Sequence, residues 1–306
     1  MPAKRKQALA SKVDAALQAA AFELTAVAPW RKYTPDSFFT ICDSSEEEYF
    51  LSFYNNDVHC LSGLDGLRSY IRFLHNRSDE VIRIALKSLC LSSNYDKYSF
   101  TSFEPGFVPW PLNDDEAELL TLIYKQATEL LKWFRAERPK MSFVMLDSPT
   151  RRYSNGIWIN EIRQIKLTPP PPKIIEPPDE MSLYRARSAP MTGAYWELEV
   201  IQLLESTQDD EQDRPYYPTL IMLANQGANE VSEVRAIPPG HDITAEVTDL
   251  LLDMIISRGK PQRIYVQSRQ LYDMLSYICD DMDVSVELVR FLSSINFYVS
   301  ERGIKT

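Results

Sequence analysis

Acidic side chains form the grouping in this sequence whose spacing is best suited to chemistry. Glu197 and Glu199 are two residues apart in an alternating stretch, so in a strand they share one face. Glu246, Asp249 and Asp253 are three and four residues apart, so in a helix they lie on neighbouring turns. Carboxylates placed in this way could hold divalent metal ions for hydrolysis, or they could be solvated surface acids. We favour the surface interpretation.

Other catalytic signatures are missing from the sequence. It contains no nucleotide-binding loop of the GxGxxG or GxxxxGK[ST] type, no GxSxG elbow and no HExxH motif. The histidines lack a neighbouring nucleophile, so we expect surface or capping roles for His59, His75 and His241. The cysteines form no CxxC and lie far apart in apolar stretches, which indicates buried free thiols at Cys42, Cys60, Cys90 and Cys279. We therefore expect no metal site and no cofactor.

Two small groups of residues could bind a ligand. Arg68 and Arg72 are one turn apart on an expected helix and could form an anion site. Phe107 and Trp110 lie in the proline-rich stretch 103–112 and could line a pocket or a partner groove. For the aromatics we favour the other interpretation, in which this stretch is a rigid loop whose aromatic side chains, Trp110 among them, are buried in the core.

The elements that position these residues are centred on residues 102–134. Three prolines keep the first half irregular, whereas Asn113 and Glu116 form a capping box in front of an apolar helical stripe. Before this stretch we expect a helix at 4–27, strands at 38–42, 49–54 and 58–61, and a helix after Gly63. After it we expect a hairpin of residues 141–146 and 156–166.

A run of prolines divides the chain. Four are consecutive at 169–172 and two more follow at 177–178, which predicts a semi-rigid polyproline II linker. We predict an N-terminal domain at 1–168, a linker at 169–178 and a C-terminal domain at 179–306, and a length of 306 residues suits two domains. The expected fold class is α+β. The first domain is predicted to be a small antiparallel sheet with helices, and the second a mixed α/β sheet.

The element order from residue 218 onward resembles that of ribonuclease-H-like folds. Their paired metals would be held by acids on the first central strand and on the strand after the first helix. Taking 218–225 as that central strand, the chain offers Asn225, Gln267 and Ser268, which are poor substitutes for carboxylates.

Charge and hydropathy restrict the partners. A formal net charge of −10 argues against a nucleic-acid backbone as the main partner. No apolar run approaches the ~18 residues that a membrane span needs. The basic run at residues 4–6 is followed by charged and polar residues, so it does not begin a signal peptide. We expect a cytoplasmic protein with no membrane contact.

Several motifs resemble those of an uncharacterised two-domain family of bacterial proteins. In the first half these are GLRSY at 66–70, PGFVPWPL at 105–112 and then Glu116-Ala117. In the second half they are Trp196-Glu197, RPYYP at 214–218 and GKPQRIYV at 259–266. The resemblance implies no activity, because the family has no assigned function. Its members often have Asp at the positions of Asn225 and Ser268, so the resemblance brings no metal role to this chain.

We therefore predict a non-enzymatic protein that binds a protein partner or a small ligand. The alternative is a hydrolase or nuclease with a degenerate ribonuclease-H-like acidic site in the C-terminal domain. A third option is a toxin–immunity or regulatory module, for which the acidic charge would suit a basic partner.

Overall fold

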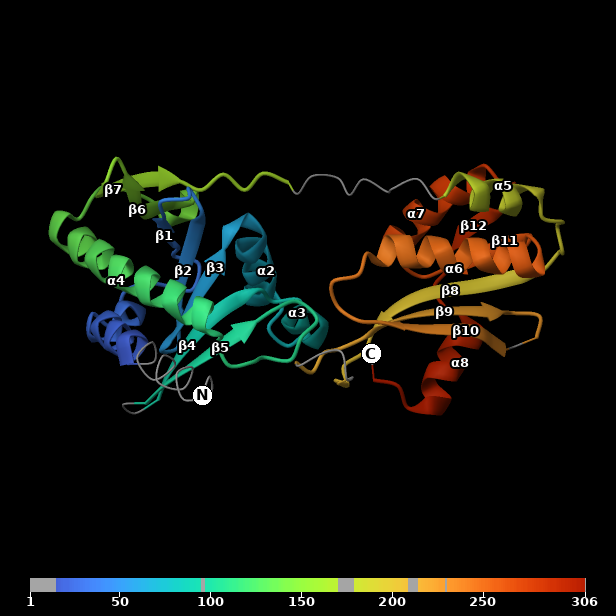
Figure 1. The fold of residues 1–306 in the computed structure, drawn as a ribbon, viewed down its shortest axis with the longest axis horizontal. Helices are drawn as coiled ribbons and strands as arrows, with labels where there is room; N and C mark the ends of the chain where they lie inside the picture. Colours follow the sequence, from blue (N-terminus) through green and yellow to red (C-terminus); the bar gives the residue numbers. More distant parts are fainter. Residues whose placement is uncertain (1–14, 95–96, 170–178, 209–213, 229, 306) are drawn as a thin grey trace, which may run out of the picture. The chain divides into compact units, whose positions relative to one another are not determined.

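The computed structural model describes residues 15–94, 97–169, 179–208, 214–228 and 230–305. The chain divides into two compact units, Met1–Pro170 and Pro171–Thr306, each built on its own sheet (Figure 1). The predicted α+β class is confirmed, and both sheets are mixed. The expected linker lies outside the described residues except for Pro169, so the domain boundaries at 168 and 179 stay predictions.

The first unit contains a seven-stranded sheet of order β5-β4-β3-β2-β1-β6-β7. Its strands are β1 (Phe39–Cys42), β2 (Glu48–Tyr54), β3 (Asp57–Ser62), β4 (Ser88–Asn94), β5 (Lys97–Phe103), β6 (Asp147–Ser154) and β7 (Ile157–Gln164). All neighbours are antiparallel except β1 and β6, which are parallel. The small antiparallel sheet expected from the sequence is therefore wider than predicted and contains one parallel pair.

Helices cover the two faces of this sheet unequally. The helices are residues 15–26, α2 (Gly63–His75), α3 (Glu80–Ile84) and α4 (Asp114–Glu137), with 3₁₀ turns at Pro29–Arg31 and Phe143–Met145. On one face, residues 15–26 and the long α4 pack against alternate side chains of β1 and β2, such as Phe39 and Leu51. On the other face, α2 packs mainly on β2 and β3 through Leu67 and Tyr70.

The predicted capping box begins α4. The Asn113 side chain accepts a hydrogen bond from the Glu116 backbone N–H at 2.8 Å, and the Asn113 N–H donates to Glu116 Oε2 at 2.9 Å. The three strands expected before α2 are also confirmed. Residues 4–14 of the expected first helix lie outside the described residues.

One predicted hairpin strand was misplaced. The strand paired with β7 is β6, at 147–154, and the expected strand at 141–146 contains a 3₁₀ turn with Val144 92% exposed. The reason is that the buried side chains on one face of β6 are hydroxyl-bearing rather than apolar: Ser148 and Thr150 are 0% and 1% exposed. The hydrophobic pattern therefore pointed to the wrong segment. Strand β5 was missed for a similar reason, because its sequence KYSFTSF is mostly polar.

The second unit contains a five-stranded sheet of order β10-β9-β8-β11-β12. Its strands are β8 (Tyr195–Gln202), β9 (Thr219–Asn225), β10 (Glu230–Ile237), β11 (Arg263–Val266) and β12 (Ser285–Leu288). β9 is antiparallel to both neighbours, whereas β8, β11 and β12 are parallel. Its helices are α5 (Glu180–Ser188), α6 (Ile243–Arg258), α7 (Arg269–Asp280) and α8 (Ser293–Arg302).

The centre of this sheet differs from the expectation. The central strand is β8, so the assignment of 218–225 as the first central strand is wrong. Figure 1 shows α5, α6 and α7 on one side of the sheet and α8 on the other. Side chains alternate along β8, so Trp196 and Leu198 pack in the core formed with α6, whereas Glu197 and Glu199 point to the face that carries α8. No helix within the described residues is long and apolar enough to cross a membrane.

The loop after β5 allows a direct test of side-chain burial. Trp110 is 40% exposed, so the expectation of a buried Trp110 is wrong, although its backbone pairs with Ser102 in a two-bond bridge. We predict that Trp110→Ala lowers the free energy of unfolding by about 1–2 kcal/mol. Phe39→Ala, at a side chain that is 0% exposed, should cost about 3–5 kcal/mol. Urea unfolding of the full chain measures both, and equal losses would contradict the placement of Trp110.

Candidate functional site

Two cavities lie over the part of the first sheet that α2 does not cover. A cavity of about 550 Å³ lies over β1, β6 and β7, with Leu64 of α2 on one side and Thr168 on another. A second cavity of about 740 Å³ continues over the other ends of the same strands, from Cys42 to Glu161. Both volumes fall in the range of small-molecule sites, roughly 300–1,000 Å³. We call the two cavities together the trough.

The floor of the trough is made of buried hydroxyls. The Ser148 hydroxyl donates its single proton to the Phe38 carbonyl at 2.9 Å, so in its 2.8 Å contact with Thr40 it accepts. Thr150 Oγ1 donates to the Ser148 carbonyl at 3.1 Å. Thr40 and Thr150 therefore use their protons inside the sheet, and both line the cavity. What these two side chains offer a ligand is the lone pairs of their oxygens.

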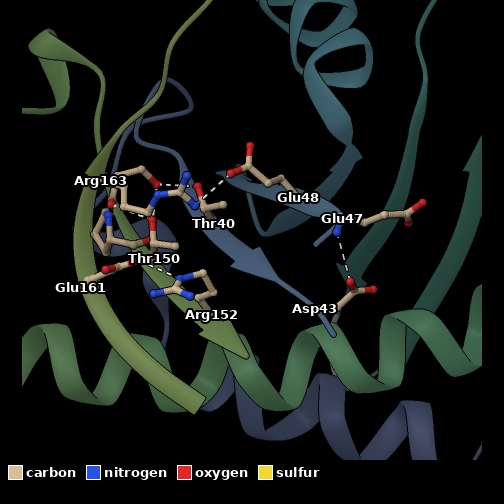
Figure 2. Close-up of polar contacts among 10 residues, drawn as sticks. Thr40, Asp43, Glu47, Glu48, Thr150, Arg152, Glu161 and Arg163 are labelled. Atoms are coloured by element: carbon tan, nitrogen blue, oxygen red, sulfur yellow. Dashed lines mark hydrogen bonds and ion pairs between the residues drawn. The ribbon is translucent and has the colours of Figure 1, made fainter. Parts of the chain in front are cut away.

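Two ion pairs surround this floor, as Figure 2 shows. Arg163 Nη1 of β7 lies 3.0 Å from Glu48 Oε1 of β2, and Arg152 Nε of β6 lies 3.2 Å from Glu161 Oε1 of β7. β7 and β2 are three strand spacings apart, about 14 Å, so the Arg163–Glu48 pair reaches across β1 and β6. Both residues line both cavities. This ion pair therefore divides the trough into its two parts.

The thiol in the trough is not an activated nucleophile. Cys42 lines the second cavity and is 4% exposed. Burial raises the pKa of the Cys42 thiol, the Glu48 carboxylate raises it further, and Arg163 lowers it by less. Nucleophilic cysteines need a lowered pKa. Among the described residues that line the two cavities none is a histidine that could act as its base.

The residues of the trough were not among the sequence candidates. The usable signal was the period-two alternation on both strands of the hairpin, which places Ser148, Thr150 and Arg152 on one face with Glu161 and Arg163. A sheet face that is uncovered and lined by hydroxyls has no alternation of apolar residues. A search for apolar periodicity therefore does not detect it.

The four sequence candidates fall into two places. Arg68 lies beside the trough: its guanidinium pairs with Asp65 at 2.6 Å and donates to the Thr168 carbonyl. Arg72 is exposed, one turn further along α2. Phe107 and Trp110 are in the loop after β5, at the opposite edge of the sheet from β7. The structure thus brings Arg68 to the trough but not the two aromatics.

The histidines have structural partners. His75 Nδ1 is 2.7 Å from the Ile71 carbonyl at the end of α2, and His241 Nδ1 is 3.1 Å from Glu246 Oε1 near the start of α6. His59 is 5% exposed, and burial lowers its pKa to about 4, so it is neutral at pH 7. The expectation of a surface or capping role is therefore wrong for His59.

Glu197 in the second unit is a structural carboxylate. It is 1% exposed, so the interpretation as a solvated surface acid is wrong. Its Oε2 accepts from the Ser294 and Ile295 backbone N–H groups at 2.9 and 3.0 Å, and Oε1 accepts from Ser293 Oγ at 2.9 Å. The N-cap residue of α8 is Leu292, which has no side-chain acceptor. Glu197 therefore caps α8 from the central strand and complements its dipole.

Glu199 is buried as well, at 8% exposed. Its oxygens accept from the Val200 N–H at 3.0 Å and, at the end of β11, from the Gln267 N–H at 3.3 Å. Burial raises the pKa of this carboxyl more than the two hydrogen bonds lower it. Ser268 at the same strand end caps α7 by accepting from the Leu271 N–H. Glu199 thus has an amide and a hydroxyl near it at this strand end rather than a second carboxylate.

The acids of α6 behave as the sequence suggested. Asp249 and Asp253 are exposed, and Asp253 pairs with Arg235 at 3.3 Å. Glu246, which is half-buried, pairs with His241. These three side chains do not join Glu199 in one site.

Comparison with known proteins gives families without an assigned function. Residues 182–301 match the model of the family described as Domain of unknown function (DUF6930), and residues 95–148 match Domain of unknown function (DUF7309). Each of the two matches covers less than half of the chain. No curated protein matches it. These matches agree with the predicted membership of an uncharacterised family, and they lie in different units of the chain.

Some solved structures are weakly similar. The HTLV-2 integrase catalytic core domain in complex with magnesium matches in its dimeric form at 13% identity and a TM-score of 0.28, covering 36% of this chain and 67% of that one. Its trimeric form matches at 15% identity and 0.27, covering 36% and 69%. A simian T-cell lymphotropic virus intasome in complex with PP2A regulatory subunit B56 gamma matches at 14% and 0.27, covering 37% and 38%. At these TM-scores the likeness carries no argument about function.

The buried carboxyl of Glu199 predicts a pH dependence. Because its pKa is raised on folding, the folded state binds more protons than the unfolded state above the ordinary pKa of Glu, so the free energy of unfolding falls as the pH rises through that window. We expect Glu199→Gln to remove this fall. Chemical denaturation of the full chain from pH 4.5 to 7 measures the slope for both proteins. An unchanged slope would mean that water solvates Glu199.

Proposed function

We propose that this protein is a non-enzymatic binding protein whose trough holds a small ligand with both N–H donors and a carboxylate, such as the end of a peptide. The observation that carries the proposal is the buried Thr40–Ser148–Thr150 floor beneath the Arg163–Glu48 ion pair. Hydroxyl oxygens with free lone pairs accept from a ligand amine or amide, and guanidinium groups pair with a carboxylate.

The ion pair favours exchange with such a ligand. The side chains of Arg163 and Glu48 are 44% and 33% exposed, and ion pairs of this kind contribute only about 0–1 kcal/mol. A ligand carboxylate can replace Glu48 on Arg163 while a ligand ammonium pairs with Glu48. Opening the pair joins the two parts of the trough, which then follows β1 and β6 in the direction of an extended chain.

Binding is favoured over catalysis by the groups that line the trough. The Cys42 thiol has a raised pKa, and two of the three lining acids, Glu48 and Glu161, are paired with arginines, whereas the third, Glu46, is exposed. Chemistry at neutral pH needs a nucleophile or base with a matched pKa. The trough supplies recognition groups instead.

The proposal is tested with a panel of dipeptides with free ends against the full chain, using calorimetry and thermal shift. We expect binding that is lost when the peptide ends are acetylated and amidated. Arg163→Gln should weaken binding by about tenfold or more, because a charged hydrogen bond is worth about 1.5–3 kcal/mol. Thr40→Val, which keeps the shape and removes the acceptor, should also weaken it.

Arg263→Gln is the matched control. Arg263 forms a similar cross-strand pair with Glu287 at 2.6 Å, but in the second unit. Its substitution should leave dipeptide binding unchanged. Absence of binding across the panel, or equal effects of Arg163→Gln and Arg263→Gln, would overturn the proposal.

The hydrolase or nuclease alternative rests on Glu199, which is buried on the central strand beside the end of β11. A two-metal site needs several carboxylates around shared ions. Glu197 is engaged by the N-terminus of α8, and Gln267 and Ser268 supply no charge. We therefore expect calorimetric titration with Mg²⁺ to show no saturable binding at millimolar concentration. Saturable binding that is lost in Glu199→Gln would favour the nuclease alternative.

A further inference from the structure

A carboxylate, an imidazole and a thiol, all of them metal-ligand types, lie close together beneath α2. They are on the same face of the first sheet as the trough, but over other strands. Asp57 and His59 lie two residues apart on β3, and Cys90 of β4 is directly paired with His59. One ligand atom from each of the three lies within 4.8 Å of the other two. His59 and Cys90 are buried, at 5% and 4% exposed, and Asp57 is half-buried. The trough does not use these residues.

We propose that Asp57, His59 and Cys90 form a site for a divalent transition-metal ion of the zinc class. Carboxylate, imidazole and thiolate together are the ligand types of Zn²⁺ and its substitutes such as Co²⁺, whereas Mg²⁺ and Ca²⁺ prefer oxygen alone. Three protein ligands leave one position of a tetrahedron for water or another ligand.

The distances suit one ion. Three atoms mutually within 4.8 Å lie within about 2.8 Å of a common point, compared with bond lengths of about 2.0–2.3 Å for Zn²⁺. His59 Nε2 and Cys90 Sγ are 3.8 Å apart, and the corresponding edge of a tetrahedral zinc site is about 3.6 Å. To reach these bond lengths each ligand atom would move toward the ion by less than about 1 Å. Rotation of the side chains can provide a movement of this size.

Neighbouring hydroxyls hold two of the ligands in place. His59 Nδ1 lies 3.3 Å from Ser88 Oγ, so this nitrogen is engaged and Nε2 is the one directed at Cys90. Ser92, which is paired with Asp57 across the strands, donates a hydrogen bond to the Asp57 carboxylate. Partners of this kind fix the ring orientation and the carboxylate position in metal sites.

Charge and access also fit. Binding of the ion releases the proton of the Cys90 thiol to solvent, and one carboxylate and one thiolate then neutralise the divalent ion, which avoids burying net charge. Asp57 has no ion-pair partner among the described residues, so its charge is available. It directly follows the turn between β2 and β3 at Asn55 and Asn56, whose positive φ angles are 47° and 69° and whose side chains are exposed. The Asp57 side of the cluster is therefore at the end of the hairpin, and a bound ion would join β3 to β4.

Metal binding is tested on the full chain after reduction and removal of metal with a chelator. Titration with Co²⁺ should give one equivalent of bound ion, with a thiolate-to-cobalt charge-transfer absorption and the ligand-field bands of a four-coordinate ion. Zn²⁺ should displace the Co²⁺ and raise the melting temperature. Cys90→Ala should abolish the charge-transfer absorption and the stoichiometric binding. Asp57→Asn, at the half-buried end of the cluster, should weaken Zn²⁺ binding at least tenfold.

Cys60→Ala is the matched control. Cys60 is equally buried and lies on β3 beside His59, but it faces the opposite side of the sheet, in the core beneath α4. This variant should keep both the absorption and the stoichiometry. If the full chain gives no charge-transfer absorption with Co²⁺, the proposal is overturned. Signals that are lost equally in Cys60→Ala, or retained in Cys90→Ala, would overturn it as well, and so would an unchanged Zn²⁺ affinity in Asp57→Asn.

Discussion

The width of the first sheet is the constraint on which the N-terminal unit depends. Seven strands span about 29 Å between the edge strands, whereas a single helix is about 10–12 Å across. On one face α4, with 24 residues and a length of about 36 Å, joins the helical residues 15–26 to close the core. On the other face α2 packs mainly on β2 and β3. The uncovered strands must therefore be hydroxyl-lined, and this places a polar trough beside an apolar core.

The same limited cover supports the proposed role of the trough as a recognition surface. Its floor is held by hydrogen bonds within the sheet, so the positions of Thr40 and Thr150 are fixed by strand geometry rather than by flexible loops. The groups that move are the long side chains above them. An ion pair between partly exposed side chains costs little to open, so under the proposed function the rigid hydroxyls would select the ligand and the long side chains would admit it.

Apolar periodicity predicted most of the elements, because β1, β2, β3 and all of the longer helices bury one face. It failed at β5 and β6, whose buried positions are partly hydroxyls, and it therefore missed the trough that β6 helps to build. The order of strands in the second sheet could not be read from the chain either. Glu197 and Glu199 looked like surface acids because only the pairing of β8 with β11 shows that β8 is central. Local sequence cannot report a contact between residues 60 or more apart.

The buried polar groups of the two units differ in how fully their hydrogen-bonding capacity is satisfied, and this difference separates a structural role from a proposed ligand-binding role. Glu197 has three close donors from the start of α8, which engage both of its oxygens, and its burial is explained by the helix that it caps. His59 and Cys90 are buried to a similar degree, but their mutual contact is a weak one at 3.8 Å. A thiol and an imidazole that are poorly satisfied by each other, with a carboxylate beside them, gain most from a shared cation. The second sheet therefore uses the buried Glu197 to hold α8, whereas the first sheet has the set of ligand atoms that the proposed metal site requires.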